Sequence, residues 1–332
     1  MGRLRSMVRR LAAVRTPFDY LADRVTVSPR ALRWAATSAL VVSILIIFTG
    51  GVVRVTGSGL GCPTWPNCNP DSLTPTGVMG IHGVIEFANR VFSAFIAVPV
   101  GWVIVAARLQ KPRERSLTRL AWSQFWLVVA NAIAGGVTVL AGLNPWVVAM
   151  HFVLAIALLT TTTLTWHRVH ETAQSVPAPV MPSARGLSWS LVAVSLVLIM
   201  VGTLVTGSGP HSGDSAEVKR MPLDWTALTI IHGLLGTAVL VLAIVLWAVL
   251  RRQPGTALAR FRSLVFIAVV IVQGAIGVTQ ALDSLPALLV AIHLLGAAFV
   301  WVGVLRVLLE VNPTLFRGMP RRQFQPEEAM SL

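Results

Sequence analysis

Eight long apolar runs, separated by short polar segments, dominate the pattern of hydrophobic and polar positions along this chain. A helix needs roughly 20 residues to cross a bilayer core of about 30 Å, and every run is long enough for this. The runs are Trp34–Val53, Val78–Ala107, Leu120–Leu140, Pro145–Trp166, Leu187–Val205, Trp225–Leu250, Leu264–Leu282 and Pro286–Leu308. The pattern therefore predicts an all-α integral membrane protein with eight transmembrane helices.

The composition agrees with this class of protein. Hydrophobic residues make up 55% of the chain and charged residues 12%, and the mean hydropathy is +0.74, as in proteins that cross a membrane many times. The sequence contains no GxxxxGK(S/T) phosphate loop, no glycine fingerprint for dinucleotides and no CxxCH site for covalent haem attachment.

The positions of the basic residues predict the orientation. If the N-terminus is cytoplasmic, 23 of the 27 Lys and Arg fall in cytoplasmic segments; the others are Arg54, Lys219 and Arg220 in outer loops and Arg90 within the second run. Because cytoplasmic loops of membrane proteins are enriched in Lys and Arg, this distribution explains the formal net charge of +14 without a nucleic-acid partner. We expect a multi-pass protein of the cell membrane with both termini in the cytoplasm.

Short motifs recur in the same order in the two halves of the chain. The matches are Thr-Gly-Ser-Gly at 56–59 and 206–209, Ile-His-Gly at 81–83 and 231–233, the Gly/Thr segments 135–138 and 274–279, and His151 with His293. Each half has four runs, so both halves have the same orientation. We therefore predict two tandem four-helix bundles related by a pseudo-two-fold axis.

The expected segments follow from this division. They are an uncleaved Arg-rich cytoplasmic tail (1–33), a first bundle (34–166) with an outer cysteine loop (54–77), a cytoplasmic linker (167–186), a second bundle (187–308) and a cytoplasmic tail (309–332).

One apolar run contains a polar cluster. Within Ile81–Arg90, His82, Glu86 and Arg90 are four residues apart, so in a helix they share one face, with Asn89 at its edge. Ionisable groups inside a membrane are costly and usually mark a functional site. The alternative is that Glu86 and Arg90 form a structural ion pair and His82 lies near the headgroups.

Four histidines, His82, His151, His232 and His293, begin the even-numbered runs at similar depth, near the outer face. A polar residue hydrogen-bonded between helices is the commoner role of any one of them. Four at matched depth in a repeat favour axial ligation of haem iron, for which facing helices of a bundle are suited. Zinc is a weaker interpretation, because the acidic partners of a catalytic zinc site are missing. We assign no chemistry to the remaining three histidines.

The two cysteines of the chain, Cys62 and Cys68, lie in the polar, glycine-rich loop after the first run. On the oxidising side of a membrane, with five residues between them, they are expected to form a disulfide. The pair is either a structural staple or redox-active. The corresponding loop of the second half (206–224) has no cysteine, so the role of the cysteine pair belongs to the first half alone.

The segment GGVVRVTGSGLGCPTWPNC, followed by IEFANR in the second run, resembles the haem A synthase family over most of residues 34–308. The resemblance implies oxidation of a methyl group of haem o to a formyl group, giving haem A for terminal oxidases, in a protein that carries haem b. It implies that haem o, delivered by haem o synthase, is the substrate. The electron acceptor and any homo-oligomer are left open.

The resemblance also implies residue roles. His232 and His293 match the pair that holds haem b, His151 matches the span-four histidine on the substrate side, and Glu86 matches a functionally important glutamate. Cys62 and Cys68 match the outer-loop pair, and Arg90 is expected to neutralise either Glu86 or a haem propionate.

At one position the sequence departs from the family. The usual span-two motif is Glu-x-x-His-Arg, and here Asn89 takes the place of the histidine. The spacing supports this alignment, because Asn89 precedes His151 by 62 residues and His232 precedes His293 by 61. His82 lies two helical turns earlier, about 10 Å away. Either His82 replaces the missing ligand, which we favour, or the substrate iron has His151 alone.

Two other function classes fit parts of the pattern. A membrane b-type cytochrome that only transfers electrons would explain the paired histidines but not the asymmetric Glu86 and cysteine loop. A haem or solute transporter would fit the repeat but predicts no stoichiometric bound haem.

Overall fold

The computed structural model describes residues 17–170, 180–211, 213–214, 219–313 and 315, and all regular elements in these ranges are helical. Predictions about residues 1–16, 171–179 and 316–332, in the two tails and the linker, lie outside the described residues. Eight helical stretches in the described ranges are long and apolar enough to cross a membrane. The protein is thus an all-α integral membrane protein, as predicted.

The spans are similar in position to the predicted runs but longer at most ends. They are Pro29–Val55 (α3), Gly77–Leu109 (the 3-10 turn η1 at Gly77–Met79, α4 at Gly80–Phe95 and α5 at Ala97–Leu109), Arg115–Leu140 (α6), Pro145–His170 (α7), Pro182–Ser208 (α8), Trp225–Arg251 (α9), Ala257–Leu282 (α10) and Ala287–Val311 (α11); a short helix, Pro17–Arg24 (α2), precedes them. The extensions consist mostly of polar flanking turns. At α3, for example, Ser28 caps the helix by accepting the N–H of Ala31 at 3.2 Å, and Pro29 follows at the first helical position.

The second span is broken, which the apolar pattern did not predict. Helix α4 ends at Phe95, Ile96 forms a turn, and α5 begins at Ala97. Pro99 explains the break, because proline has no N–H to donate to residue 95 and its ring clashes with that carbonyl. Helix α4 is therefore free to leave the course of α5, and it carries the polar cluster.

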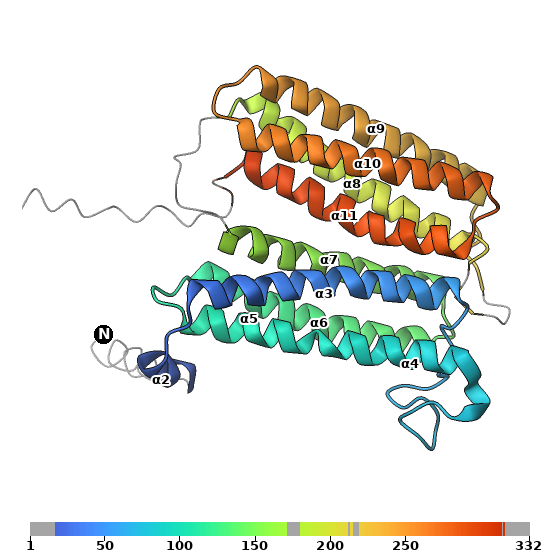
Figure 1. Ribbon diagram of the computed structural model, residues 1–332. Coiled ribbons are helices and arrows are strands. Elements are labelled where there is room, and N and C mark those ends of the chain that lie inside the picture. Colours follow the sequence, from blue (N-terminus) through green and yellow to red (C-terminus); the bar gives the residue numbers. More distant parts are fainter. Residues whose placement is uncertain (1–16, 171–179, 212, 215–218, 314, 316–332) are drawn as a thin grey trace, which may run out of the picture.

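The spans pack in two groups (Figure 1). Helices α8 to α11 pack side by side, α9 against α8 and α10, and α11 against α8 and α10; α3, α5, α6 and α7 pack likewise. The groups meet through α3 and α7 on one side and α11 and α8 on the other. The predicted pseudo-two-fold relation of two bundles stays a prediction.

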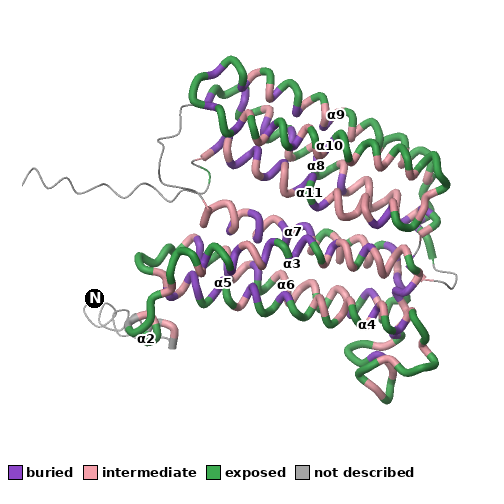
Figure 2. Tube along the Cα trace, in the orientation of Figure 1, coloured by how far each residue is buried: buried purple, intermediate pink, exposed green. Residues whose placement is uncertain are grey.

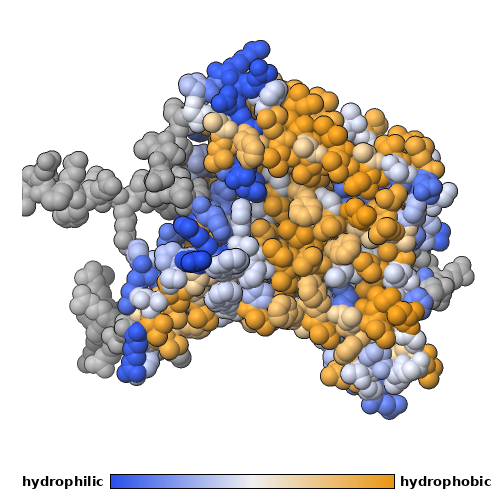
Figure 3. Space-filling model, in the orientation of Figure 1, coloured by the Kyte–Doolittle hydropathy of each residue, from blue (hydrophilic) through white to orange (hydrophobic). Residues whose placement is uncertain are grey.

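The buried residues lie where the helices face one another (Figure 2), in two clusters. One fills the second group and continues between α3, α7 and α11, and the other lies between α3, α5 and α6. Outward-facing apolar side chains cover the flank of the molecule (Figure 3), as expected of a surface in contact with lipid. We call the end that carries the loop after α3 the disulfide end, and the end with the α5–α6 and α9–α10 loops the arginine end.

The two halves are also joined at the disulfide end. Arg54 of α3 donates through Nη2 to the carbonyl of Thr206 at 2.7 Å and through Nε to that of His211 at 2.9 Å. The N–H of Gly59 donates to the carbonyl of Gly213 at 2.7 Å, and that of Leu60 to Asp214 Oδ2 at 3.1 Å. Residues in or next to both Thr-Gly-Ser-Gly segments thus form the contact between the two halves at this end.

Candidate functional site

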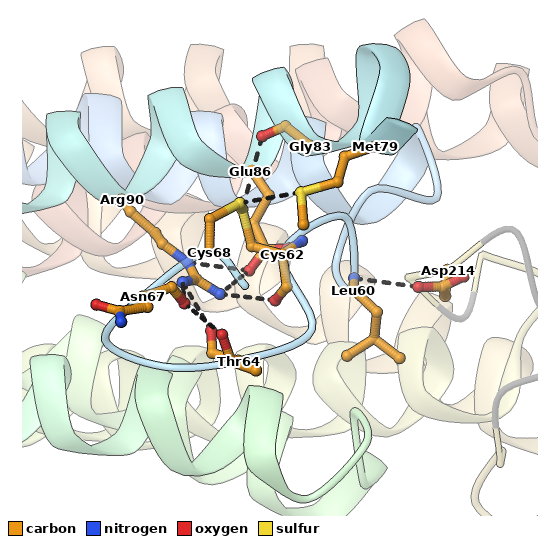
Figure 4. A network of polar contacts seen from close by, with 10 residues as sticks. All are labelled: Leu60, Cys62, Thr64, Asn67, Cys68, Met79, Gly83, Glu86, Arg90 and Asp214. Atoms are coloured by element: carbon orange, nitrogen blue, oxygen red, sulfur yellow. Dashed lines mark hydrogen bonds and ion pairs between the residues drawn. A yellow bond between two sulfur atoms is a disulfide. The ribbon is translucent and has the colours of Figure 1, made fainter. Parts of the chain in front are cut away.

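Glu86 lies on α4 and is only 4% exposed. Its Oε2 accepts the N–H of Cys62 at 2.6 Å, and its Oε1 accepts Nε and Nη2 of Arg90 at 3.1 and 2.5 Å (Figure 4). Ionised carboxylate oxygens each offer about two acceptor positions, so Oε2 retains one. The buried charge is paired and bonded, which a charge in this position requires.

Arg90 attaches the cysteine loop to α4. Besides Glu86, its Nη1 donates to the carbonyls of Thr64 and Asn67 at 2.9 and 3.1 Å, and its Nη2 donates to that of Cys62 at 2.9 Å (Figure 4). A guanidinium has five N–H donors in a fixed plane, and five hydrogen bonds use them. This supports the interpretation of Arg90 as a structural partner of Glu86 over that of a propionate ligand.

Cys62 and Cys68 form the predicted disulfide, with Cα atoms 4.4 Å apart. Both residues are fully buried. We call residues 57–76 the disulfide loop. Since Arg90 binds carbonyls at Cys62, Thr64 and Asn67, the disulfide and the arginine hold the same small ring of chain.

The disulfide loop also reaches α6. A Cβ on Gly136 of α6 would lie 2.6 Å from Cδ2 of Trp65, so this ring covers the glycine. Helix α4 packs on α3, and it is the other part of its span, α5, that packs on α6. The loop thus connects α4, through Arg90, with α6, through Trp65.

His82 is the third residue of α4 and lies against the loop. Its Nδ1 is 3.0 Å from Oγ of the buried Ser58, and it lines a cavity of about 320 Å³ together with Gly61, Met79 and Asp214. His82 is thus in contact with the disulfide loop. The role predicted for His82 as an iron ligand stays a prediction.

Asn89 is two turns further along α4. Its Oδ1 is buried and has no hydrogen-bond partner among the described residues. A buried polar atom without a partner is unfavourable unless an absent ligand or water satisfies it. Of His82 and Asn89, the two candidates for the substrate side, only Asn89 has a buried polar atom without a partner in the described residues.

The three other histidine rings each pack against a glycine of the preceding helix. A Cβ on Gly135 would lie 3.2 Å from Cε1 of His151, and a Cβ on Gly277 would lie 3.2 Å from Cε1 of His293; Gly202 has the same relation to His232 at 2.9 Å. A larger residue at these glycines would displace the rings. Gly135 and Gly277 belong to the two repeated Gly/Thr segments, but the sequence did not show that these glycines contact histidine rings.

His232 and His293 face each other in the second half. Their ring centroids are 6.2 Å apart, with an interplanar angle of 63°. With metal–nitrogen bonds of about 2 Å, two imidazoles on opposite sides of one iron have centroids about 6 Å apart. Nδ1 of His232 is 3.2 Å from the carbonyl of Leu198, an arrangement that leaves Nε2 for a metal. Nδ1 of His293 is buried without a partner in the described residues. The pair fits a haem iron.

Sequence reasoning did not find several residues of the site. Ser58, Thr64, Trp65, Asn67 and Asp214 contribute through backbone carbonyls, ring contact or long-range bonds. Such contacts leave no spacing pattern in a single sequence. Of these residues, only Ser58 lay in a repeated motif that the sequence had singled out, the Thr-Gly-Ser-Gly segment.

A family model described as cytochrome oxidase assembly protein (COX15-CtaA) matches residues 32–79 and 78–305. The chain is similar to proteins named "Heme A synthase" from Lysinibacillus sphaericus (27% identical over 201 residues, 59% of this chain and 62% of that protein) and Symbiobacterium thermophilum (29% over 206 residues, 58% and 64%). Another, from Geobacillus kaustophilus, is 25% identical over 202 residues, 58% of this chain and 61% of that protein. The matches span less than two thirds of the length of these curated relatives.

Proposed function

Because this chain belongs to the COX15-CtaA family of cytochrome oxidase assembly proteins, we propose that it is a haem A synthase, an oxidoreductase that converts a methyl group of haem o into the formyl group of haem A. The observation that carries the proposal is the asymmetry of the two halves. One half has a histidine pair at the spacing of an iron site, and the other has a buried carboxylate beneath a disulfide loop.

On the cofactor side, His232 and His293 would hold haem b. Bound there, the haem would supply one-electron transfer. The protein's part is to fix the rings: Gly202 and Gly277 give them room, and the bond from Nδ1 of His232 to the carbonyl of Leu198 sets its orientation.

On the substrate side, His151 and Asn89 would face haem o, and Glu86 would act on the proton released from the methyl group. Oε2 of Glu86 has one acceptor position left, whereas Oε1 is fully used by Arg90. A proton accepted at Oε2 would be held close to the Cys62 N–H. General-base action of this kind contributes about 10²–10⁴-fold to a rate.

A membrane b-type cytochrome is the second candidate, and the His232–His293 pair favours it equally. It gives no reason for Glu86 and Arg90, whose counterparts are missing from the second half: in the Ile-His-Gly register, Gly236 occupies the place of Glu86. Arg90 holds the disulfide loop in either case. The free acceptor position on Oε2 of the buried Glu86 has a use only in the enzyme, which therefore explains more of the chain.

The proposed setting is the cell membrane, with both termini in the cytoplasm and the disulfide end outside. Haem o would come from haem o synthase, and haem A would go to the assembly of a terminal oxidase. The electron acceptor is a separate partner.

The test is expression in cells that make haem o but lack their own haem A synthase, followed by extraction of the pigments. Haem A, or a hydroxylated precursor of it, supports the enzyme. Haem b alone would indicate the electron carrier, and a protein without haem would favour a transporter. Glu86→Ala in the same cells tests the site, because normal haem A levels would exclude a catalytic role for this residue.

A further inference from the structure

A second cavity, of about 500 Å³, lies at the arginine end, far from the disulfide loop. It is lined by Arg108, Arg113, Arg115, Thr118, Arg119, Trp122, Ser123 and Trp126. These residues come from the end of α5, the short loop after it and the first three turns of α6. The α2 helix lies against α5 at this end (Figure 1). The cavity plays no part in the proposed chemistry.

The α6 residues form one stripe. Arg115, Arg119, Trp122 and Trp126 follow the spacing i, i+4, i+7 and i+11, which places them on one face of the helix. Two cationic side chains at the helix start are thus followed by two indole rings. Trp126 is 64% exposed and both arginines are exposed, whereas Trp122 is half-buried and packs against the core between α3, α5 and α6. The stripe therefore lies at the edge of the helix group.

Three of the arginines that line the cavity have no acidic partner in the described part of the chain. Among the described residues, no carboxylate pairs with Arg108, Arg115 or Arg119, and the neighbouring Glu114 is engaged by Arg168 at 3.0 Å. The second half differs at the same end, since Arg262 lies 3.8 Å from Glu310.

Two buried donors point to a missing acceptor. Nε of Arg108 and Nε1 of Trp122 are both buried and have no hydrogen-bond partner in the described part of the chain. Both side chains line the cavity. Leaving such a donor unsatisfied costs about 1–3 kcal/mol, so a ligand with oxygen acceptors at this place would be stabilised.

The length of α6 indicates the depth of the cavity. Its 26 residues span about 39 Å at 1.5 Å per residue, which exceeds a hydrocarbon core of about 30 Å. The apolar run of this helix begins at Leu120, so Arg115 and Arg119 extend into the headgroup region. Trp122 then lies at the interface, where indole rings are favoured, and Trp126 lies one turn deeper, beside the acyl chains.

We propose that this cavity is a binding site for an anionic phospholipid. The phosphate lies between the arginines, its oxygens accept the N–H groups of Arg108 and Trp122, and the acyl chains continue past Trp126 along the apolar face of α6. Arginine forks suit phosphate oxygens, and basic pockets at the cytoplasmic ends of spans recognise such headgroups. A zwitterionic lipid has the same phosphate but adds a cation, which Arg108, Arg115 and Arg119 would repel.

The experiment measures lipid retained by the full-length protein in nanodiscs made from mixtures of phosphatidylglycerol and phosphatidylcholine, with quantification by mass spectrometry after delipidation and rebinding. We expect phosphatidylglycerol to be enriched. Each arginine near an anionic lipid contributes about 1 kcal/mol, or roughly fivefold, so Arg115→Gln/Arg119→Gln should weaken its binding about 25-fold. The matched control is Arg251→Gln/Arg252→Gln, which removes equal charge at the same end outside the cavity.

Two further measurements distinguish binding of the whole lipid from binding of a free anion and from binding of the headgroup alone. Inorganic phosphate at millimolar concentration should not displace phosphatidylglycerol, and Trp126→Ala should weaken binding of the lipid but not of soluble glycerophosphoglycerol. Equal retention of the two lipids, an equal loss in the control variant, or displacement by phosphate alone would overturn the proposal. Thermal unfolding of each variant in phosphatidylcholine confirms that it is folded.

Discussion

The indole ring of Trp65 occupies the space that a side chain on Gly136 of α6 would need: a Cβ there would lie 2.6 Å from the ring. Trp65 belongs to the disulfide loop, and the same loop is held by Arg90 of α4. The loop therefore depends on two helices of the first half. A change that weakens either the Trp65–Gly136 contact or the bonds of Arg90 to the loop is therefore expected to shift the disulfide loop over Glu86.

Gly136→Ala is expected to displace Trp65 and destabilise the protein. The added methyl group has no room, and overpacking of this kind costs about 1–3 kcal/mol. Thermal unfolding followed by tryptophan fluorescence measures the change. Gly101→Ala is the control, because nothing lies within 4 Å of a Cβ there, and alanine raises helix stability by up to about 1 kcal/mol. If the two variants shift the unfolding temperature in the same direction, Trp65 does not depend on Gly136.

Arg90→Lys is expected to loosen the disulfide loop although the charge is kept. Lysine has three donors on a single nitrogen and cannot reproduce five bonds in one plane. At least two of the five hydrogen bonds are lost, at about 1.5 kcal/mol or more each for bonds of a charged group. A total of about 3 kcal/mol would expose the buried Cys62–Cys68 bond roughly a hundredfold more often. The rate of labelling by a thiol reagent under mild reduction measures this exposure. An unchanged rate would show that the guanidinium is not what holds the loop.

Glu86→Gln is expected to separate catalysis from structure. The amide oxygen can still accept the Cys62 N–H, so the loop is retained better than in Glu86→Ala, but the side chain no longer takes up a proton. We expect haem A formation to fall about 10²-fold or more, with bound haem b unchanged in the optical spectrum. Haem A at the level of the unaltered protein would remove Glu86 from the proposed reaction.

His232→Ala and His293→Ala are each expected to lower bound haem b about tenfold or more, since loss of even an outer-shell partner reduces metal affinity roughly 10–100-fold. His151→Ala should leave haem b in place and reduce haem A. The absorption spectrum of each purified variant measures the amount of bound haem b per protein, which is compared with that of the unaltered protein. Loss of haem b from the His151 variant would mean that the two sites are assigned wrongly.

His82→Ala and Asn89→Ala distinguish the two positions on the substrate side. Because His82 contacts Ser58 in the loop, whereas Oδ1 of Asn89 is buried without a partner among the described residues, we expect the Asn89 variant to lose more affinity for added haem o. Titration of the purified protein with haem o, read from the absorption spectrum, compares them. The reverse order would restore His82 as the iron ligand predicted from the sequence.

The sequence by itself determined the approximate spans and the disulfide. Runs of roughly 20 apolar residues leave few alternatives to a transmembrane helix, since the bilayer permits no unsatisfied backbone, and two cysteines six positions apart allow one pair. The repeat singled out His232 and His293 as candidates, and the structure places their ring centroids 6.2 Å apart; their role as ligands stays a prediction.

Only the tertiary structure decided how Glu86 and Arg90 are used and where His82 and Asn89 lie. Spacing placed His82, Glu86 and Arg90 on one helix face, with Asn89 at its edge. It could not specify that the loop at 57–76 folds back, presents its carbonyls to Arg90 and packs Trp65 on Gly136. Such contacts join positions far apart in the chain through backbone atoms, which every residue has. A single sequence therefore carries no record of them.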